Sequence, residues 1–266
     1  MAAPPLLSPS EVERYARHLV LREIGGPGQQ RLKAARMLVV GAGGLGTPAA
    51  LYLAAAGVGT IGLLDPDRVS LSNLQRQVLF TTGDVGTAKV TAGAAHLAAL
   101  NPEITLVPHD VRLDDHNADA LLAGYDIILD GTDDFATRFA VNAACLRLKR
   151  PLVSGALGRW TGQVGVFGVG DGPCYRCLVP EIPPEAETCQ AVGVIGALAG
   201  MIGAMMALEA IKLAAGLTQG LIGRLLVHDA LAAETRTLRV PRDPGCPGCG
   251  GHRPPDPSLN LPGVRT

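Results

Sequence analysis

The chain has 266 residues, of which 47% are hydrophobic and 18% charged, so it can bury a full core and is not expected to be disordered. Its formal net charge of −1 argues against a nucleic-acid-binding protein and against a protein of the membrane surface. Because aromatic residues make up only 3%, the core is expected to consist of Ala, Leu, Val and Ile.

The first part of the chain alternates apolar strands with helices. We expect a helix over residues 8–33, with Ser8 or Ser10 as its N-cap, and expect the Gly-Gly-Pro-Gly run at 25–28 to interrupt it. The strands that follow are expected at 37–40, 61–64, 104–107 and 127–129, and the helices at 45–56, 89–100 and 135–149. This pattern predicts an α/β fold with a doubly wound, mostly parallel, Rossmann-like sheet.

The second part of the chain continues the sheet and adds one long apolar helix. The expected strands are 152–153, 163–169, 224–228 and 235–240. The apolar stretch 193–208 has 16 residues, fewer than the ~20 that span a bilayer, so we expect a buried helix or a subunit interface and no membrane span. Residues 1–250 are expected to form a single domain, followed by a Pro-rich, flexible tail at 251–266.

The start of the chain gives no sign of secretion. Residues 1–7 are Pro-rich and have no basic leader, so we expect a cytoplasmic protein. In that compartment the six cysteines are expected to serve metal binding or chemistry, since disulfides are rare there.

Four of the cysteines form two CxxC pairs, Cys174 with Cys177 and Cys246 with Cys249. Four thiolates make a closed tetrahedral zinc site with no open position for water, so the pattern predicts a structural Zn²⁺. The metal would act as a zinc clip that fastens the C-terminal part to the middle of the chain. Redox pairs or a coincidence of spacing are the alternatives.

A glycine-rich turn follows the strand at 37–40 and opens the next helix. Gly41, Gly43 and Gly46 stand in the sequence GAGGLG, with Gly44 inside the same turn, and Asp65 ends the second strand. This context fits a dinucleotide-fold fingerprint, in which helix N–H groups attract phosphate and the acid bonds ribose hydroxyls. Alone, the motif indicates a nucleotide, with NAD as the usual ligand, or a glycine turn without a ligand.

Two cations that follow this acid favour a triphosphate over NAD. Arg76 and Lys89 offer a guanidinium and an ammonium, which offset the charge of ATP phosphates and of a phosphorus under attack. A nicotinamide site has little use for either cation. Their alternative interpretation is that of ordinary solvated charges.

Three carboxylates follow the strand at 127–129. Ligands of open α/β sheets bind at the carboxyl ends of strands, and Mg²⁺ prefers one or two carboxylates together with substrate oxygens. We expect Asp133 to hold Mg²⁺ and expect Asp130 or Asp134 to cap the next helix or give polar support.

The two remaining cysteines differ in their surroundings. Cys189 lies in a polar stretch, which predicts an accessible thiol, although the neighbouring Glu185 and Glu187 count against a strongly activated thiolate. Cys145 lies in an apolar helical pattern and is expected in the core, and Trp160 is expected to pack.

These motifs together resemble the MoeB/ThiF group, the bacterial relatives of ubiquitin-activating enzymes. The likeness runs from about Arg14 to Cys249 and includes RYARH, GAGGLG, DPDRVSLSNLQRQ, GTAKV, LDGTDD and the two CxxC pairs. The SNLQRQ segment and the split cysteine pairs are its most specific parts, because nicotinamide dehydrogenases lack them.

The resemblance implies a homodimer with one ATP site per subunit and a role for individual residues. It implies that Arg17 reaches into the partner's site, although Arg14 and Arg17 by themselves fit a solvated helix face. It further implies that Arg76 and Lys89 contact phosphates and that Asn73 helps to hold the nucleotide.

Asp133 would manage Mg²⁺, and Cys189 matches the loop cysteine that becomes covalently attached to the carrier in ThiF-like members. The chain departs from the family at Thr132-Asp133-Asp134, where TDN is common, so Asp134 adds a carboxylate beside the metal or faces away from it.

The implied activity is ATP-dependent adenylation of the C-terminal glycine carboxylate of a small ubiquitin-like sulfur-carrier protein, MoaD-like or ThiS-like, with a Gly-Gly end. The product leads to a thiocarboxylate for molybdopterin, thiamin or related pathways. The chain ends soon after the second CxxC pair, without an appended rhodanese domain, so we expect a separate sulfur donor.

Rival interpretations are a NAD-dependent oxidoreductase, a non-catalytic scaffold that holds a partner, and a relative that adenylates a short peptide or an RNA base.

Overall fold

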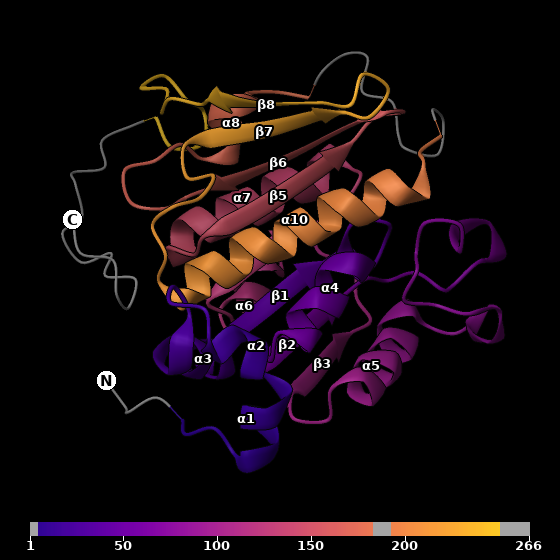
Figure 1. The fold of residues 1–266 in the computed structure, drawn as a ribbon. Coiled ribbons are helices and arrows are strands. Elements are labelled where there is room, and N and C mark those ends of the chain that lie inside the picture. The colour runs from indigo at the N-terminus through magenta and orange to yellow at the C-terminus, as the bar shows by residue number, and fades with distance from the viewer. Residues whose placement is uncertain (1–4, 183–192, 251–266) are drawn as a thin grey trace.

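The computed structural model describes residues 5–182 and 193–250 of the chain. Within these residues the centre of the fold is an eight-stranded sheet of order β3-β2-β1-β4-β5-β6-β7-β8, drawn in Figure 1. The first five strands in this order run parallel: β3 (Thr105–His109), β2 (Thr60–Leu64), β1 (Arg36–Val40), β4 (Ile127–Asp130) and β5 (Leu152–Leu157). The others are antiparallel: β6 (Thr161–Phe167), β7 (Arg224–Asp229) and β8 (Glu234–Arg239).

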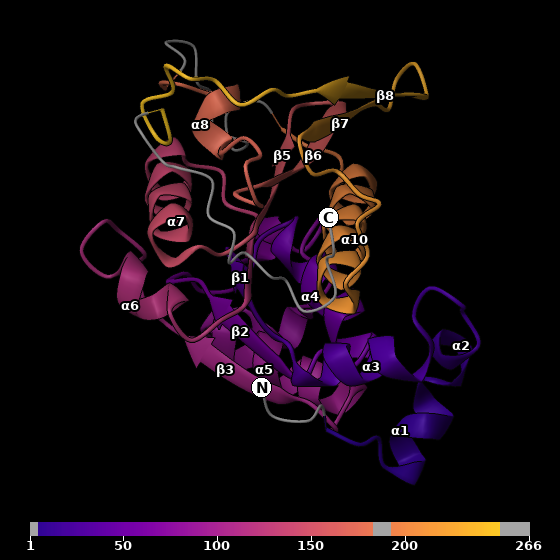
Figure 2. The ribbon, with the colours of Figure 1, turned by 90° about the vertical axis from the view of Figure 1, so that its left-hand side faces the viewer.

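Helices cover both faces of the parallel part, as Figure 2 shows. The larger apolar cluster joins one face to α3 (Gly25–Ala34), α4 (Gly46–Ala55), α5 (Lys89–Leu100) and α10 (Gly196–Ala215). The smaller cluster joins the other face to α6 (Ala118–Leu122), α7 (Phe135–Leu148) and α8 (Tyr175–Leu178). The predicted α/β class and its doubly wound, mostly parallel arrangement are therefore confirmed, although the sheet turns antiparallel after β5.

Helix α10 is the long apolar segment of the second half of the chain. By length and composition it could cross a membrane, and 50% of its apolar window is buried inside the fold. It packs against α3, α4, β5 and β6, which is the position of a core helix. The expected buried helix is thus found there, and it ends at Ala215, seven residues beyond the apolar run. Glu209 in this added part is buried and accepts the backbone N–H of Leu221 at 2.9 Å.

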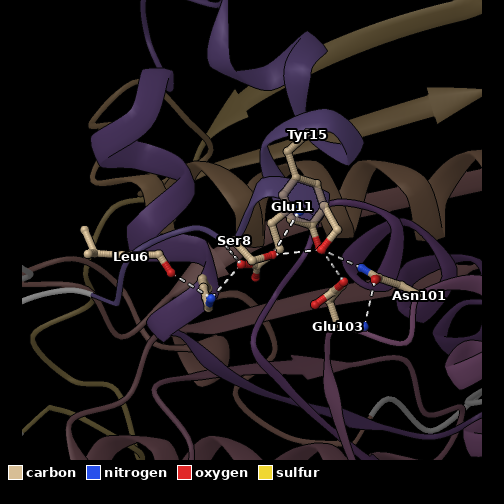
Figure 3. Close-up of polar contacts among 8 residues, drawn as sticks. Leu6, Ser8, Glu11, Tyr15, Asn101 and Glu103 are labelled. Carbon is tan, nitrogen blue, oxygen red and sulfur yellow. Dashed lines mark hydrogen bonds and ion pairs between the residues drawn. The ribbon is translucent and has the colours of Figure 1, made fainter.

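The N-terminal helix expected over residues 8–33 is three shorter helices, α1 (Pro9–Arg14), α2 (Ala16–Leu19) and α3. Ser8 caps α1 in a capping box with Glu11, as expected, and the buried Glu11 pairs with Lys33 of α3 at 2.6 Å (Figure 3). The expectation for residues 25–28 was wrong, because this glycine-rich run begins α3 and does not interrupt a helix.

A second set of polar contacts holds the N-terminal helices to α5. The Tyr15 hydroxyl accepts a hydrogen bond from the Asn101 side chain at 2.8 Å, and Asn101 also accepts the backbone N–H of Glu103 at 3.1 Å (Figure 3). The chain between α1 and α2 is therefore fixed to the end of α5.

Cys145 is 3% exposed, which confirms a core residue, whereas Trp160 is 40% exposed at the turn between β5 and β6, so its expected packing was wrong. The short helix α6 was not expected, because its five residues are too few to show a helical period. The tail at 251–266 and Cys189 lie outside the described residues.

Candidate active site

The glycine turn joins β1 to α4 at the carboxyl ends of the parallel strands. Gly41 has a φ of 88°, in the left-handed region that favours glycine. A Cβ on Gly46 would stand 1.8 Å from the carbonyl oxygen of Gly41, so a side chain does not fit there. No described side chain caps the start of α4. In this first turn the N–H of Thr47 donates to Gly43 O at 3.0 Å, the N–H of Ala49 donates to Leu45 O at 3.2 Å, and Pro48 has no N–H. The N–H of Gly46 therefore remains for a phosphate group.

Asp65 follows β2 and is 5% exposed. Its Oδ2 accepts the N–H of Ala42 in the glycine turn at 2.8 Å, and its Oδ1 accepts the N–H of Asp67 at 2.8 Å. Lys89, the first residue of α5, places its Nζ 3.4 Å from both Asp65 oxygens and 2.9 Å from the Asp67 carboxylate. Burial raises the pKa of Asp65, and the Lys89 charge opposes that rise. The acid and the cation predicted for the nucleotide thus lie side by side.

Arg76 lies just after the short turn η1 (Leu71–Asn73). Its guanidinium donates to Asn73 Oδ1 at 3.0 Å, and its stem lies against the glycine turn, because a Cβ on Gly44 would stand 3.3 Å from Arg76 Cγ. Asn73, which the resemblance assigns to the nucleotide, orients Arg76 in this structure.

The three carboxylates after β4 have different surroundings. Asp134 is the N-cap of α7 and accepts the N–H of Thr137 at 2.9 Å, while Asp130 is fully buried and accepts the Thr132 N–H at 3.0 Å. Capping and polar support by these two residues are as expected. Asp133 is exposed and lies near Gly131, which lines the same hollow. Because it is exposed, its carboxylate is open to solvent and to a cation.

Arg138 is a buried arginine on α7 that its sequence context did not mark as a site residue. It donates to the carbonyl oxygens of Thr132 and of Gly155, the latter at 2.9 Å, and its guanidinium lies 5.9 Å from the ring centre of Tyr175. These bonds tie the loop that carries Asp133 to β5 and α8. An arginine in a helix is normally expected to be a solvated charge. The one signal in the sequence is that Arg138 lies four residues after the Asp134 cap, on the side of the helix that faces the strand ends.

Two adjoining hollows lie at the ends of these strands. The larger, about 340 Å³, is called the Arg76 hollow, and the smaller, about 150 Å³, the Lys89 hollow. Side chains that line the Arg76 hollow include Arg76, Phe135, Arg138, Gln163 and Tyr175. Those that line the Lys89 hollow include Asp65, Asp67, Gln77, Lys89 and Arg112. Both are lined by Gly43, Gly131, Thr132 and Asp133, so Asp133 stands at the boundary between them.

This arrangement suits a phosphate chain next to a second anion. The Arg76 guanidinium lines one hollow and the Lys89 ammonium lines the other, so positive charge lies on both sides of the boundary and can stabilise an anion there. A carboxylate open to solvent at the same point can share a divalent cation with phosphate oxygens.

Two predicted site residues lie elsewhere. Arg17 is exposed on α2 and lines neither the Arg76 nor the Lys89 hollow of its own chain. Cys189 falls outside the described residues.

The two CxxC pairs meet in space although they are far apart in the chain. Cys174 Sγ lies 3.6 Å from Cys246 Sγ, Cys177 Sγ lies 3.5 Å from Cys249 Sγ, and all four sulfurs lie within 4.8 Å of one another. A tetrahedral ion with bonds of 2.3 Å to sulfur sets the sulfurs about 3.8 Å apart. Burial raises the pKa of Cys177 to about 11, so a nearby cation is needed to hold its thiolate at neutral pH. The four residues fit one metal ion.

The fold and the two hollows define a nucleotide-binding α/β protein of the Rossmann-like class. The chain belongs to the ThiF family, whose pattern it matches over residues 15–248.

Curated relatives match along most of the chain. It is 47% identical to the sulfur carrier protein adenylyltransferase of Thermus thermophilus, over 90% of this chain and 91% of that protein. It is 46% identical to the molybdopterin-synthase adenylyltransferase of Escherichia coli K12, over 92% of this chain and 98% of that protein. It is 48% identical to the adenylyltransferase and sulfurtransferase MOCS3 of Anopheles gambiae, where 91% of this chain covers 56% of the longer protein.

Solved structures agree on the fold. E. coli MccB with MccA-N7isoASN superposes with a TM-score of 0.80 at 24% identity, over 90% of this chain and 75% of that one. E. coli MccB with ATP superposes with a TM-score of 0.75 at 23% identity, over 85% of this chain and 70% of that one. At these identities the likeness establishes the architecture alone.

Proposed function

We propose that this protein uses ATP to adenylate the C-terminal glycine carboxylate of a small ubiquitin-like sulfur-carrier protein. The observation that carries the proposal is the pair of adjoining hollows with Asp133 at their boundary. The Lys89 hollow has the acid and cation for a nucleotide, and the Arg76 hollow has room and positive charge for an incoming carboxylate. The names of the Thermus and E. coli relatives support the same activity.

The reaction needs position and charge more than acid–base chemistry. The carrier's carboxylate, already an anion, attacks the α-phosphorus of ATP in line, the bond to pyrophosphate breaks, and an acyl-adenylate remains. Arg76 and Lys89 stabilise the charge on the phosphates, and Arg138 fixes the loop that holds Asp133. When bound, Mg²⁺ would be held by Asp133 and would neutralise charge on the leaving pyrophosphate.

The carrier's tail reaches the Arg76 hollow along a neighbouring groove. A third hollow of about 420 Å³, lined by Arg159, Trp160 and Ile195 among others, shares Val194 with the Arg76 hollow. The exposed Trp160 and Ile195 give this groove an apolar wall, which suits the backbone of an extended Gly-Gly segment with few side chains.

The functional unit is a homodimer. Helix α10 presents an outward row of apolar side chains at helical spacing, Ala197, Met201, Ala204, Leu208 and Ile211, of which Leu208 is 55% exposed. Such a row in an otherwise buried helix supports a protein interface. In the dimer, Arg17 completes the partner's site, which accounts for its position outside the hollows of its own chain.

The metal of the cysteine cluster is Zn²⁺ in a structural role. Four sulfurs leave no position for substrate, and Cys174 directly precedes Tyr175, which lines the Arg76 hollow. The clip therefore supports the wall of the site without taking part in the chemistry.

Sulfur comes from a separate donor, which displaces AMP and gives a thiocarboxylate for molybdopterin, thiamin or a related product. Of the five described cysteines, Cys145 is buried and the others form the metal cluster, so none of these lies in the hollows as a relay. None of the five described cysteines forms a disulfide, which together with the use of ATP fits the reducing cytoplasm.

Exchange of labelled pyrophosphate into ATP tests the proposal. Purified protein, ATP, Mg²⁺ and a Gly-Gly carrier should exchange the label, whereas a carrier without its last glycine should not. A non-catalytic scaffold would bind the carrier without exchange, and an oxidoreductase would bind NAD in preference to ATP, so either result would replace this function.

A further inference from the structure

Gln77 is a buried polar side chain with an unused hydrogen-bonding group. The residue is 3% exposed, and among the residues that the structure describes nothing donates a hydrogen bond to its Oε1. Its backbone is fixed by two turn bonds, from its own N–H to Asn73 O at 3.0 Å and from Phe80 N–H to Gln77 O at 3.1 Å. The segment thus holds the Gln77 Oε1 in a buried place where no described group donates to it, which opposes folding.

The same chain contains a buried glutamine in the opposite condition. Gln29 is fully buried, donates from Nε2 to Ala56 O at 2.8 Å and pairs its Oε1 with His18 Nδ1 at 3.0 Å. The Gln29 side chain therefore holds two segments of the fold together, whereas the Gln77 Oε1 makes no such bond to the described residues.

The Gln77 amide faces the nucleotide pocket. The residue lines the Lys89 hollow together with Asp65, Lys89 and Asp133. Its Nε2 lies beside the glycine turn, where a Cβ on Gly43 would stand 3.9 Å from it. Arg76, the residue before it, lines the adjoining Arg76 hollow, so two successive side chains serve the two compartments.

We propose that the carboxamide of Gln77 is a nucleotide-contacting group that hydrogen-bonds to the phosphate chain and its water shell. The inference rests on the proposed ATP site. The amide N–H groups donate to phosphate oxygens, which are the strong acceptors expected beside Lys89 and the glycine turn. Oε1 accepts from a water of the same shell, and a half-turn of the amide exchanges the two ends. The bound nucleotide and its water would thus supply the hydrogen-bond partner that Oε1 does not find among the described residues.

The experiment compares Gln77→Met with Gln29→Met, since methionine keeps the length of both side chains and removes the amide. Calorimetric titration measures the affinity of each full-length variant for ATP with Mg²⁺ and for adenosine. Denaturant unfolding without nucleotide measures the midpoint of each variant. For Gln77→Met we expect a loss of ATP affinity of about 10-fold, unchanged adenosine affinity and a midpoint no lower than that of the parent protein. For Gln29→Met we expect a lower midpoint and unchanged ATP affinity.

Each other outcome overturns the proposal. Unchanged ATP affinity in Gln77→Met shows that the amide does not contact the nucleotide. An equal loss of affinity for adenosine shows that the amide contacts the nucleoside and not the phosphate chain. A midpoint lowered as much as in Gln29→Met shows a structural role.

If Gln77→Met does not fold, the isosteric Gln77→Glu replaces it in the titration. A carboxylate at this position should repel phosphate and weaken ATP binding by more than the roughly 10-fold loss expected for methionine. If the parent protein binds no ATP, the proposed function is wrong as well. The other contrary results concern Gln77 alone and leave the proposed function unchanged.

Discussion

Lys89 Nζ lies 3.4 Å from both carboxylate oxygens of Asp65, and both side chains are almost completely buried. The pairing follows from the fold, because Asp65 ends a parallel strand and Lys89 begins the helix that returns along the same face. The ammonium that is proposed to meet ATP phosphate is therefore also the group that balances a buried acid. Its removal must affect folding and binding together.

Lys89→Met should lower the free energy of unfolding by about 3 kcal/mol, because it leaves the Asp65 carboxylate buried without its cation. It should also abolish stabilisation by ATP, which for the parent protein is about 2.7 kcal/mol at a concentration 100 times the dissociation constant. Denaturant unfolding with and without ATP measures both effects.

Lys33→Met is the matched control, since Lys33 pairs with the buried Glu11 at 2.6 Å far from the hollows. It should cost about 2 kcal/mol of stability and keep the full ATP effect. A Lys89→Met protein that ATP still stabilises would remove Lys89 from the phosphate contacts.

Asp133→Ala should abolish pyrophosphate exchange and leave stability unchanged within about 0.5 kcal/mol, because the exposed carboxylate makes no contact that folding requires. The exchange assay and thermal unfolding are measured on the same preparation. Retained exchange would take Asp133 out of the proposed Mg²⁺ site.

The adjacent Asp134→Ala should show the reverse pattern. It removes the N-cap of α7, which accepts the Thr137 N–H at 2.9 Å, and should cost about 1 kcal/mol of stability with exchange retained. Asp134→Asn should restore the stability, because asparagine caps as well as aspartate does. Equal loss of exchange at both positions would indicate that the two carboxylates share the cation.

Removal of the metal should destabilise the whole domain. The purified protein should contain about one zinc per chain, and a strong chelator should lower the thermal midpoint by about 10 °C or more, since structural zinc contributes on the order of 10 kcal/mol to folding. Because Tyr175 follows Cys174 and lies beneath Arg138, exchange activity should fall with the metal. Metal analysis with differential scanning calorimetry checks this, and a metal-free protein with an unchanged midpoint would argue for unliganded thiols.

The stability of the protein should depend on His109 between about pH 5.5 and 7.5. Its ring bonds the Tyr125 hydroxyl at 2.7 Å, and burial lowers the pKa of the imidazole. The unfolded chain, with a histidine pKa of about 6.5, then binds the proton more readily than the folded protein does, so stability declines as the pH falls below about 6.5. Unfolding of His109→Asn at both pH values should show a smaller decline, and an unchanged decline would assign the effect to other groups.

Cys189→Ala should leave pyrophosphate exchange unchanged, because adenylation uses the anionic tail and needs no thiol. Intact-mass analysis of the carrier then shows whether thiocarboxylate formation requires Cys189. Loss of that step alone favours a covalent route through the cysteine, whereas loss of exchange would place the residue in the adenylation site itself.

Local sequence decided those features of the molecule that depend on neighbouring residues. Apolar runs predicted the strand that Asp65 follows and the strand that ends at Asp130. The Ser8 and Asp134 caps could be predicted because a cap acts within three residues of itself. The glycine turn could be predicted for the same reason, since the positive φ of Gly41 and the close backbone approach at Gly46 both require glycine.

Features that depend on contacts between distant segments were not predicted from the sequence, or were predicted wrongly. The sequence predicted that Trp160 packs and that a helix breaks at residues 25–28, and both expectations were wrong because burial and helix limits depend on elements that pack from elsewhere in the chain. Arg138 and Gln77 looked like ordinary polar residues until the fold placed one under the Asp133 loop and the other, with an amide oxygen that no described group satisfies, in the Lys89 hollow. The residue type determines which chemistry a side chain can perform. Whether the side chain is paired, buried or open to a ligand is decided by long-range packing, because packing brings its neighbours to it.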